Sequence, residues 1–311
     1  MAVDVVCLGI LVADVVVRPF RGMPSAGSLD MVEEIALRAG GCALNTASIL
    51  ARFGLRTAVV GKVGKDQFGE FLLSVLDQRG IDHANVTRGD TPTSTTVVLV
   101  DDDGERTFLH NPGANATLND SEIDLTQILS AKALHIGGAL VMASLDGPPM
   151  AQILGEAKAR GLHTSLDVVF DPTDKWDRAR SCLPKLDLFC PSLAEARAIA
   201  GEQDPSRAAA WIHARGTPEV VITMGAKGCL VSNPERQEFL DGVAVNAIDG
   251  TGAGDAFTAG LLYGKLAGWP LQRSARLATA VGALATTEVG ATEGVRGLDE
   301  ALSMSGLTAE A

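Results

Sequence analysis

The chain has 311 residues, of which 46% are hydrophobic, 21% charged and 4% aromatic, and its formal net charge is −12 at pH 7. This length accommodates one large α/β domain with a small accessory element, or two modest domains. A negative charge without a clustered run of Lys and Arg excludes a duplex-binding protein, and the scarcity of aromatic rings disfavours a protein that stacks single-stranded bases.

Short β-branched runs alternate along the chain with longer segments rich in Ala and Leu. The runs predict strands, several of them apolar on both faces, and the longer segments predict amphipathic helices. This alternation is typical of βαβ units, so we expect an α/β fold with a Rossmann-like, mostly parallel sheet sandwiched by helices. The expected strands are residues 3–8, 57–60, 133–136, 164–166, 186–190 and 220–223, and the expected helices include residues 45–53, 68–80, 149–160, 206–215 and 256–266.

Two regions interrupt this alternation. Residues 93–100 and 106–110 predict two strands, joined by a polar connection in which Gly104 is a hairpin signal, and residues 12–37 also contain extended pieces. Neither region is followed by the long crossover that a parallel strand needs, so we expect a small inserted antiparallel β-sheet that acts as a lid, with an ordinary edge hairpin as the alternative. The expected lid is residues 12–37 and 93–110, and the expected main domain is residues 1–11, 38–92 and 111–311.

The most informative segment runs from Asp249 to Asp255 and has glycines at 250, 252 and 254, directly before a predicted helix. Glycines let backbone N–H groups turn toward an anion, and the N-terminus of a helix adds partial positive charge, so the segment predicts an anion hole for phosphate groups. Asp255 can accept the proton of an attacking hydroxyl there, although a helix N-cap is the alternative role. The segment is neither a P-loop nor GxGxxG, which disfavours a dehydrogenase.

Several polar residues are candidates for binding a substrate. Gly40 and Gly41 precede a predicted helix that carries Asn45 on its first turn, and such amides can bind several hydroxyls, although close helix–strand packing is the alternative. Asp14 follows the first strand, where ligands bind in open α/β sheets, or it is a surface acid. His110, at the end of the predicted lid, is a further candidate, whereas the other four histidines are expected to be structural or solvent-facing.

The five cysteines are scattered and none forms a CxxC pair, which predicts free thiols in a reducing compartment. The N-terminus lacks the basic region of a signal peptide, and no apolar stretch approaches membrane-spanning length. We therefore expect a cytoplasmic protein with no membrane partner and no nucleic-acid partner.

Five motifs, taken in order, resemble those of the ribokinase-like (PfkB) carbohydrate kinases along almost the whole chain. The resemblance implies a Rossmann-like domain with a β-sheet lid, and transfer of a phosphoryl group from ATP, with Mg²⁺, to a hydroxyl of a sugar or sugar-like substrate. The motifs are Gly40-Gly41 with Asn45, residues 61–66 with Phe68-Gly69, Gly113-Ala114-Asn115, residues 223–228 and residues 249–255, of which the last is the most specific.

The resemblance also implies roles for individual residues. Asp255 matches the family's catalytic base, and Glu195 matches the acid of an NxxE motif that organises the water shell of Mg²⁺. Asp249 matches a position near a monovalent cation, which allows activation by K⁺. The anion hole then comprises Gly252, Ala253 and Gly254, the substrate contacts are Asp14, Gly40, Gly41 and Asn45, and the nucleotide turn comprises Thr223, Gly225 and Gly228.

Three positions depart from the family's pattern. Ser192 replaces the usual Asn, so altered nucleotide contacts are expected there, and Thr279 stands where many members place Asn or His beside adenine. Asp171 lies where acid-sugar kinases and fructokinases carry the Arg of DxNxR, and this missing cation argues against a 2-keto-3-deoxygluconate substrate.

Two other functions stay open. A nucleoside kinase would use the same chemistry but usually stacks its base on an aromatic ring, and this chain has one Tyr and nine Phe. A non-catalytic sugar or nucleotide sensor on the same fold is disfavoured because Asp255 is present. We also expect a homodimer formed through the exposed face of the lid sheet.

Overall fold

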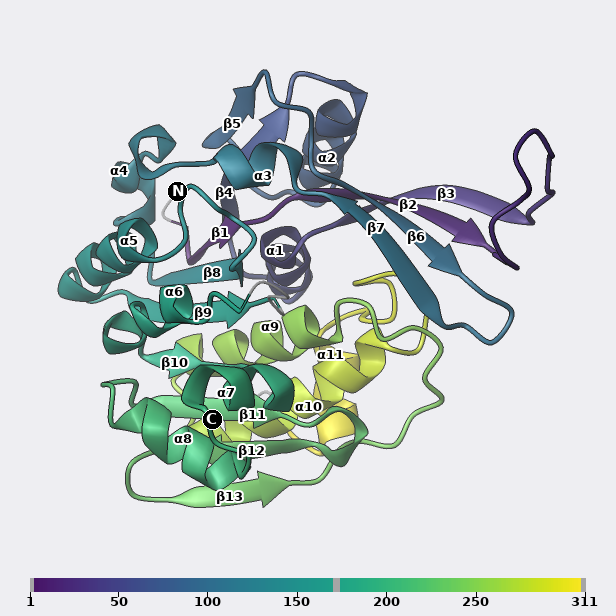
Figure 1. Ribbon diagram of the computed structural model, residues 1–311. Helices are drawn as coiled ribbons and strands as arrows, with labels where there is room; N and C mark the ends of the chain where they lie inside the picture. Colours follow the sequence, from purple (N-terminus) through teal and green to yellow (C-terminus); the bar gives the residue numbers. More distant parts are fainter. Residues whose placement is uncertain (1–2, 170–173, 309–311) are drawn as a thin grey trace.

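The computed structural model describes residues 3–169 and 174–308, which form two β-sheets and the helices around them (Figure 1). Over this part of the chain the larger sheet has nine strands in the order β13-β12-β11-β10-β9-β8-β1-β4-β5, all parallel except for antiparallel pairing of β12 with its two neighbours. All six predicted strand positions are confirmed. The strands are β1 (Val5–Gly9), β4 (Thr57–Gly64), β5 (Val86–Gly89), β8 (Ala133–Ala139), β9 (His163–Val168), β10 (Leu188–Phe189), β11 (Glu219–Thr223), β12 (Cys229–Ser232) and β13 (Gln237–Leu240).

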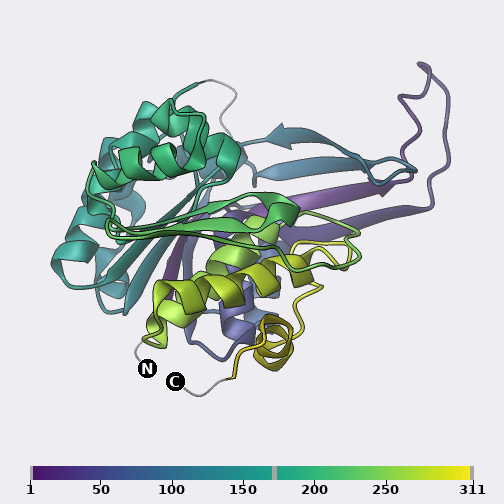
Figure 2. The same cartoon turned by 90° about the horizontal axis from the view of Figure 1, so that it is seen from below.

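Helices cover both faces of the large sheet (Figure 2). The alternation of side chains along β1 explains why both faces are apolar: Val6 and Leu8 belong to one core cluster, and Val5 and Cys7 belong to the other. The first cluster includes residues of α5, α7 and α8, and the second includes residues of α1, α2, α9, α10 and α11. The helices are α1 (Cys42–Arg52), α2 (Gln67–Gln78), α3 (Gly113–Thr117), α4 (Leu125–Ile128), α5 (Pro148–Ala159), α6 (Asp177–Arg180), α7 (Leu193–Ala200), α8 (Pro205–His213), α9 (Ala253–Leu266), α10 (Leu271–Ala285) and α11 (Leu298–Ser305).

The small sheet extends away from the helices and has the strand order β3-β2-β6-β7 among the described residues (Figure 1). Both outer pairs are antiparallel, as predicted, but the central pair of β2 and β6 is parallel. The crossover that this parallel pair requires is long, because the chain passes through the main sheet between the two strands. The strands are β2 (Val12–Arg18), β3 (Glu34–Gly40), β6 (Thr95–Val100) and β7 (Arg106–Asn111).

The two faces of the small sheet differ in polarity. One cross-strand row joins Arg38, Asp14, Thr96 and His110 on one face. The next row presents its side chains to the opposite face, because side chains alternate along each strand. That row consists of Leu37, Val15, Val97 and Leu109.

Among the described residues, no helix has the length and apolar character needed to cross a membrane. All five cysteines lie in the described part of the chain, and each is free, in agreement with the prediction of unpaired thiols.

Candidate active site

The glycine loop (residues 249–254) leads into α9 at the carboxyl edge of the large sheet. Gly252 is the N-cap of α9 with φ 73°, and a Cβ there would overlap the carbonyl of Ala291, so both backbone and space require glycine. A Cβ at Gly254 would meet nothing within 4 Å, so the backbone at this position faces open space. The first N–H groups of α9 lack intrahelical acceptors and carry the positive end of the helix dipole, which suits them to an anion.

Asp255 lies in the first turn of α9 and is buried. Asn45 Nδ2 in α1 donates a hydrogen bond of 2.7 Å to Asp255 Oδ2, although the two residues are 210 positions apart. Burial raises the pKa of Asp255, while hydrogen bonds from Asn45 and Cys42 oppose that rise. The alternative role as an N-cap is wrong, because Gly252 occupies that position. A buried carboxylate with a raised pKa is a stronger proton acceptor than an exposed one.

Two further residues lie beside Asp255 and were not predicted as site residues. Ligand atoms of Cys42, Asp167 and Asp255 lie within 4.8 Å of one another. Burial, together with the charges of Asp255 and Glu195, raises the pKa of Asp167 well above its ordinary value. The position of Asp167 at the end of the apolar strand β9 is a signal that could have found it.

This group of acids can accommodate a divalent cation. Mg²⁺ prefers oxygen ligands, and carboxylates that repel one another in a buried site are stabilised by a nearby cation. Asp167 and Glu195 therefore fit the role. Cys42 does not, because burial raises the pKa of its thiol well above the ordinary value and a neutral thiol is a poor ligand.

Glu195 and Ser192 form a capping box at the start of α7. Ser192 N donates to Glu195 Oε2 at 2.7 Å, and Glu195 N donates to Ser192 Oγ at 3.3 Å. An isolated parallel bridge pairs Ser192 with Thr223, so these two predicted nucleotide residues lie side by side. Burial raises the pKa of Glu195, against the hydrogen bonds from Ser192.

The predicted nucleotide turn follows β11. Gly225 and Gly228 have φ values of 59° and 89°, and a Cβ at Gly228 would overlap the carbonyl of Leu240 on β13. Thr279 lies in α10, where its hydroxyl donates to the carbonyl of Ala275 at 2.8 Å. The positive φ values and the close approach of β13 therefore explain the glycines of this turn. The Thr279 hydroxyl donates its hydrogen bond within its own helix.

The two glycines before α1 make room for their neighbours. A Cβ at Gly40 would overlap Oδ2 of Asp14, and one at Gly41 would overlap the carbonyl of Ile10. Close packing, the alternative role for these glycines, therefore accounts for their presence, and Gly40 also allows Asp14 its position. Asn45 Oδ1 is buried and has no hydrogen-bond partner among the described residues, so it can accept a hydrogen bond from a ligand hydroxyl.

Asp14 and His110 both face Thr96, a residue that the sequence did not single out. Burial raises the pKa of Asp14 to about 6, partly offset by a hydrogen bond from Thr96. Thr96 Oγ1 lies 3.0 Å from His110 Nδ1, and burial lowers the pKa of His110. Asp14 is thus a strand residue on the polar face of the small sheet, and the surface-acid alternative is wrong.

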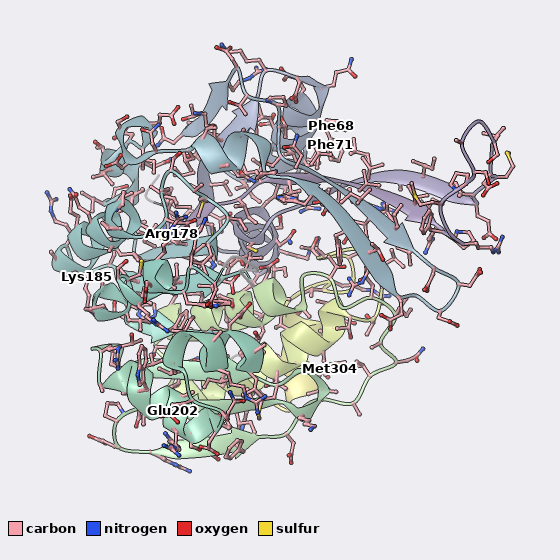
Figure 3. The ribbon with its side chains drawn as sticks, in the orientation of Figure 1. Phe68, Phe71, Arg178, Lys185, Glu202 and Met304 are labelled. Carbon is pink, nitrogen blue, oxygen red and sulfur yellow. The ribbon has the colours of Figure 1, made fainter. Side chains whose placement is uncertain are left out.

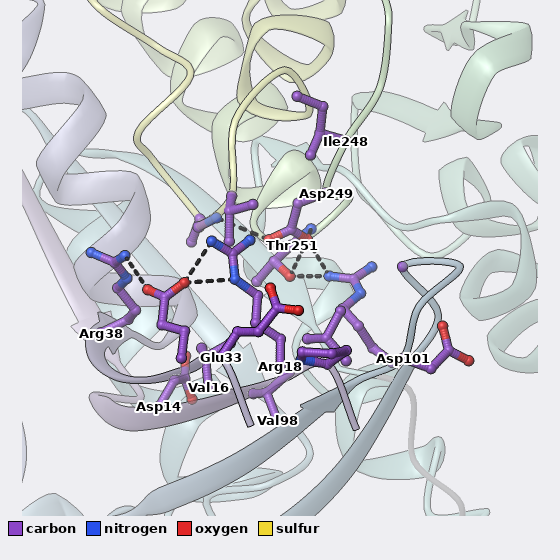
Figure 4. Close-up of a pocket in the computed structure, with 18 of the residues that line it drawn as sticks. Asp14, Val16, Arg18, Glu33, Arg38, Val98, Asp101, Ile248, Asp249 and Thr251 are labelled. Carbon is purple, nitrogen blue, oxygen red and sulfur yellow. Dashed lines mark hydrogen bonds and ion pairs between the residues drawn. The ribbon is translucent and has the colours of Figure 1, made fainter. Parts of the chain in front are cut away.

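A cavity of about 550 Å³ lies between the polar face of the small sheet and the loops at 248–251 and 289–291 (Figure 4). Among the described residues that line it, none is aromatic. Phe68 and Phe71 lie instead on α2, near the base of the small sheet (Figure 3). At the lining, Arg106 Nη1 contacts Asp249 Oδ1 at 2.6 Å. Asp171, the position of the missing Arg, lies outside the described residues.

The sequence and the fold of this chain have counterparts in known proteins. The family model described as pfkB family carbohydrate kinase matches residues 2–296. This chain belongs to the pfkB family of carbohydrate kinases. This pfkB-family protein is 34% identical over 267 residues to a fructokinase of Klebsiella pneumoniae. The matched region covers 81% of this chain and 87% of the fructokinase.

Solved structures of similar fold cover nearly the whole chain. Arabidopsis thaliana ribokinase in complex with ribose and ATP has a TM-score of 0.84 at 24% identity, covering 99% of this chain and 100% of that chain. An Escherichia coli ribokinase II structure with ATP and Mg²⁺ has a TM-score of 0.84 at 23% identity, covering 97% and 98%. The predicted family, enzyme class and fold class are confirmed by these matches.

Proposed function

We propose that this protein transfers the γ-phosphoryl group of ATP to a hydroxyl of an uncharged sugar or sugar-like substrate, with Asp255 as the base. The observation that carries the proposal is the buried Asp255 carboxylate, held by Asn45 directly beside the N-terminal amides of α9. A proton acceptor and a phosphate-binding helix terminus at one place are what in-line phosphoryl transfer requires.

In the proposed reaction, Asn45 Oδ1 and the Asp14 carboxylate accept hydrogen bonds from substrate hydroxyls. The acceptor hydroxyl gives its proton to Asp255 and forms a bond to the γ-phosphorus, while the bond to the bridging oxygen breaks and ADP leaves with that electron pair. The amides from Gly252 to Asp255 donate to the transferring group, whose negative charge they stabilise. Mg²⁺, when bound near Asp167 and Glu195, would neutralise phosphate charge.

The charge of the cavity favours an uncharged substrate over a sugar acid. Its lining includes three arginines, and each of them already contacts a carboxylate in the structure. The acids among the lining residues outnumber these arginines, so a substrate carboxylate would meet net repulsion. The acids are Asp14, Glu33, Glu34, Asp101, Asp102 and Asp249.

The alternative of a nucleoside kinase lacks support from the cavity, because its described lining offers no aromatic ring for a base. The sensor alternative would predict binding without turnover. Loss of the acceptor carboxylate would be expected in such a protein, whereas Asp255 is present and partly pre-oriented by its hydrogen bond with Asn45.

We also propose that two copies pair through the apolar face of the small sheet. Ile35 and Leu109 on that face are 67% and 58% exposed, and contiguous exposed apolar side chains favour association. Leu109→Asp should therefore shift the protein from dimer to monomer in size-exclusion chromatography with light scattering. A wild-type protein that is monomeric at high concentration contradicts this pairing. Free buried thiols are in keeping with a proposed cytoplasmic location.

The proposed reaction is tested by ADP release across a panel of pentoses, hexoses, sugar acids and nucleosides. We expect turnover with an uncharged sugar, and Asp255→Asn should lower kcat by about 10²–10⁴-fold while leaving thermal unfolding nearly unchanged. Asp90→Asn is the matched control, since Asp90 is an exposed acid paired only at the surface with Lys65. Near-wild-type turnover in Asp255→Asn would show that Asp255 is not the base.

A further inference from the structure

Arg106 connects the tip of the small sheet with the glycine loop. It is the first residue of β7 and follows the hairpin turn at 101–105. Its Nη1 contacts Asp249 Oδ1 at 2.6 Å and also contacts the Thr251 hydroxyl. The side chains of Arg106 and Asp249 are 26% and 12% exposed, so their ion pair is shielded from most of the solvent.

The carboxylate of Asp249 accepts four hydrogen bonds from the described residues. Oδ1 accepts from Arg106 Nη1, from Thr251 N at 2.9 Å and from Thr251 Oγ1 at 2.7 Å, and Oδ2 accepts from Gly290 N at 2.9 Å. Each oxygen of an ionised carboxylate has about two lone-pair sites, so Oδ1 is saturated by its three donors, whereas Oδ2 has one donor. Although burial opposes ionisation, the donors together lower the pKa of Asp249.

This arrangement disfavours a monovalent cation at Asp249. An ion at Oδ1 would meet a saturated oxygen and the guanidinium of Arg106, and an ion at Oδ2 would approach a carboxylate that this guanidinium already pairs with. The negative charge that would attract K⁺ is already neutralised within the chain. The expectation of activation by K⁺, which the resemblance allowed, therefore disagrees with the geometry around Asp249.

We propose that Arg106 holds the small sheet closed over the site and supplies the positive charge at Asp249, so that turnover does not depend on an added monovalent cation. The proposal rests on the proposed kinase function, because it assigns Arg106 as a positioning residue for that reaction. Arg106 acts through Asp249 and Thr251, which order the loop whose amides face the phosphoryl group.

One consequence is a coupling between substrate enclosure and the anion hole. If the tip of the small sheet moves away, Asp249 loses a charged partner and Thr251 loses a hydrogen bond in the same motion. The glycine loop is then less ordered just when the cavity is open to water. Closure by Arg106 would thus complete the anion hole only when the substrate is covered.

The test compares Arg106→Gln and Arg106→Lys with the wild type in the ADP-release assay, in KCl and in tetramethylammonium chloride at equal ionic strength. We expect a wild-type rate that is the same in both salts. Arg106→Gln should lose up to about 100-fold in kcat/KM and regain part of it in KCl, because the vacated carboxylate can then bind K⁺. Arg106→Lys should retain indifference to K⁺, since it keeps the charge. Arg21→Gln is the matched control, because Arg21 forms an exposed ion pair with Asp102 in the loops that extend from the strands of the same sheet.

Three results would overturn the proposal: a wild type that requires K⁺, an Arg106→Gln variant with wild-type kinetics, or a loss in that variant that KCl does not reverse. Hydrogen exchange gives a readout that needs no substrate. Arg106→Gln should speed exchange in both the tip of the small sheet and the glycine loop, whereas Arg21→Gln should leave the loop unchanged. Unchanged loop exchange in Arg106→Gln refutes the closure, whereas absence of turnover with every sugar in the wild type refutes only the proposed function.

Discussion

The two sheets of this protein differ in how their faces are covered. The nine-stranded sheet is covered by helices on both faces, and Val5 and Leu8 in its strand β1 are completely buried. The small sheet has a polar face over the cavity and an apolar face on which Ile35 and Leu109 are largely exposed. A sheet with two cores resists deformation, whereas a sheet with one covered face can move without unfolding the protein.

The candidate site divides along the same boundary. The acceptor acid and the anion-binding amides stand on α9, which packs against the large sheet, while Asp14 and His110 stand on strands of the small sheet. We therefore expect changes on the large sheet to affect folding or the chemical step. Changes on the small sheet should mainly affect the KM for the sugar, and the following variants test this division.

The largest difference should appear in stability. Leu8→Ala removes a completely buried side chain from β1, which lies between β4 and β8, and should lower the free energy of unfolding by about 2–5 kcal/mol. Leu109→Ala, at a side chain that is 58% exposed in a single copy, should change the free energy of unfolding of the monomer by less than about 1 kcal/mol. Urea denaturation followed by circular dichroism measures both. An equal decrease in the free energy of unfolding in both variants would mean that the two sheets unfold together as one cooperative unit.

Asn45→Ala should affect the chemical step more than substrate binding. It removes the donor that orients Asp255 Oδ2 and leaves that buried carboxylate without this partner, which raises its pKa further. We expect kcat to fall by roughly 10–100-fold, with the acid limb of its pH profile moved to higher pH. Steady-state kinetics between pH 5 and pH 9 check this. A change confined to KM would place Asn45 with the small-sheet residues instead.

Gly40→Ala should raise the KM for the sugar, because the added methyl group overlaps the Asp14 carboxylate and displaces it. An increase of about tenfold is expected, with a smaller effect on kcat. Gly54→Ala is a useful comparison for added volume, since a Cβ there meets nothing within 4 Å, although its φ of 88° brings backbone strain. An unchanged KM in Gly40→Ala would show that Asp14 does not contribute to binding the sugar.

The last expected effect is a pH dependence of the KM for the sugar. Asp14 has a pKa raised to about 6, so its stronger acceptor form is lost below that pH, and the sugar KM should fall about tenfold between pH 5 and pH 7. Because this folded-state pKa lies above the unfolded value, the group stabilises the fold below about pH 4, and that contribution is lost as pH rises through 6. Asp14→Asn should give a higher KM that does not vary in this range.

The sequence predicted the large sheet well because its signals are local. Apolar runs and helical periodicity recur at each βαβ unit, and the positive φ of Gly252 at the start of α9 is also a local requirement. The parallel pairing of β2 and β6 was not predictable in this way, because it depends on two hairpins that the chain brings together only through the main sheet.

The residues missed at the site share the same cause. Thr96 and Arg106 are ordinary residues in their local sequence, and they acquire roles from Asp14 and Asp249, which are distant in the sequence. Asp167 carries a local signal at the end of β9, but its neighbours Asp255 and Glu195 are also distant in the sequence. The motifs predicted Asn45 and Asp255 separately, but the hydrogen bond between them follows from the packing of α1 against α9. Local sequence patterns therefore predicted individual site residues, whereas the contacts between these residues depend on tertiary packing.

The contact between Asn45 and Asp255 has a consequence for biosynthesis. Asn45 leaves the ribosome early, whereas Asp255 follows only after every described strand of both sheets has been translated. A nascent chain can thus fold most of its scaffold while it still lacks the acceptor acid. Truncated translation products that end before α9 should accordingly be inert toward cellular sugars and nucleotides.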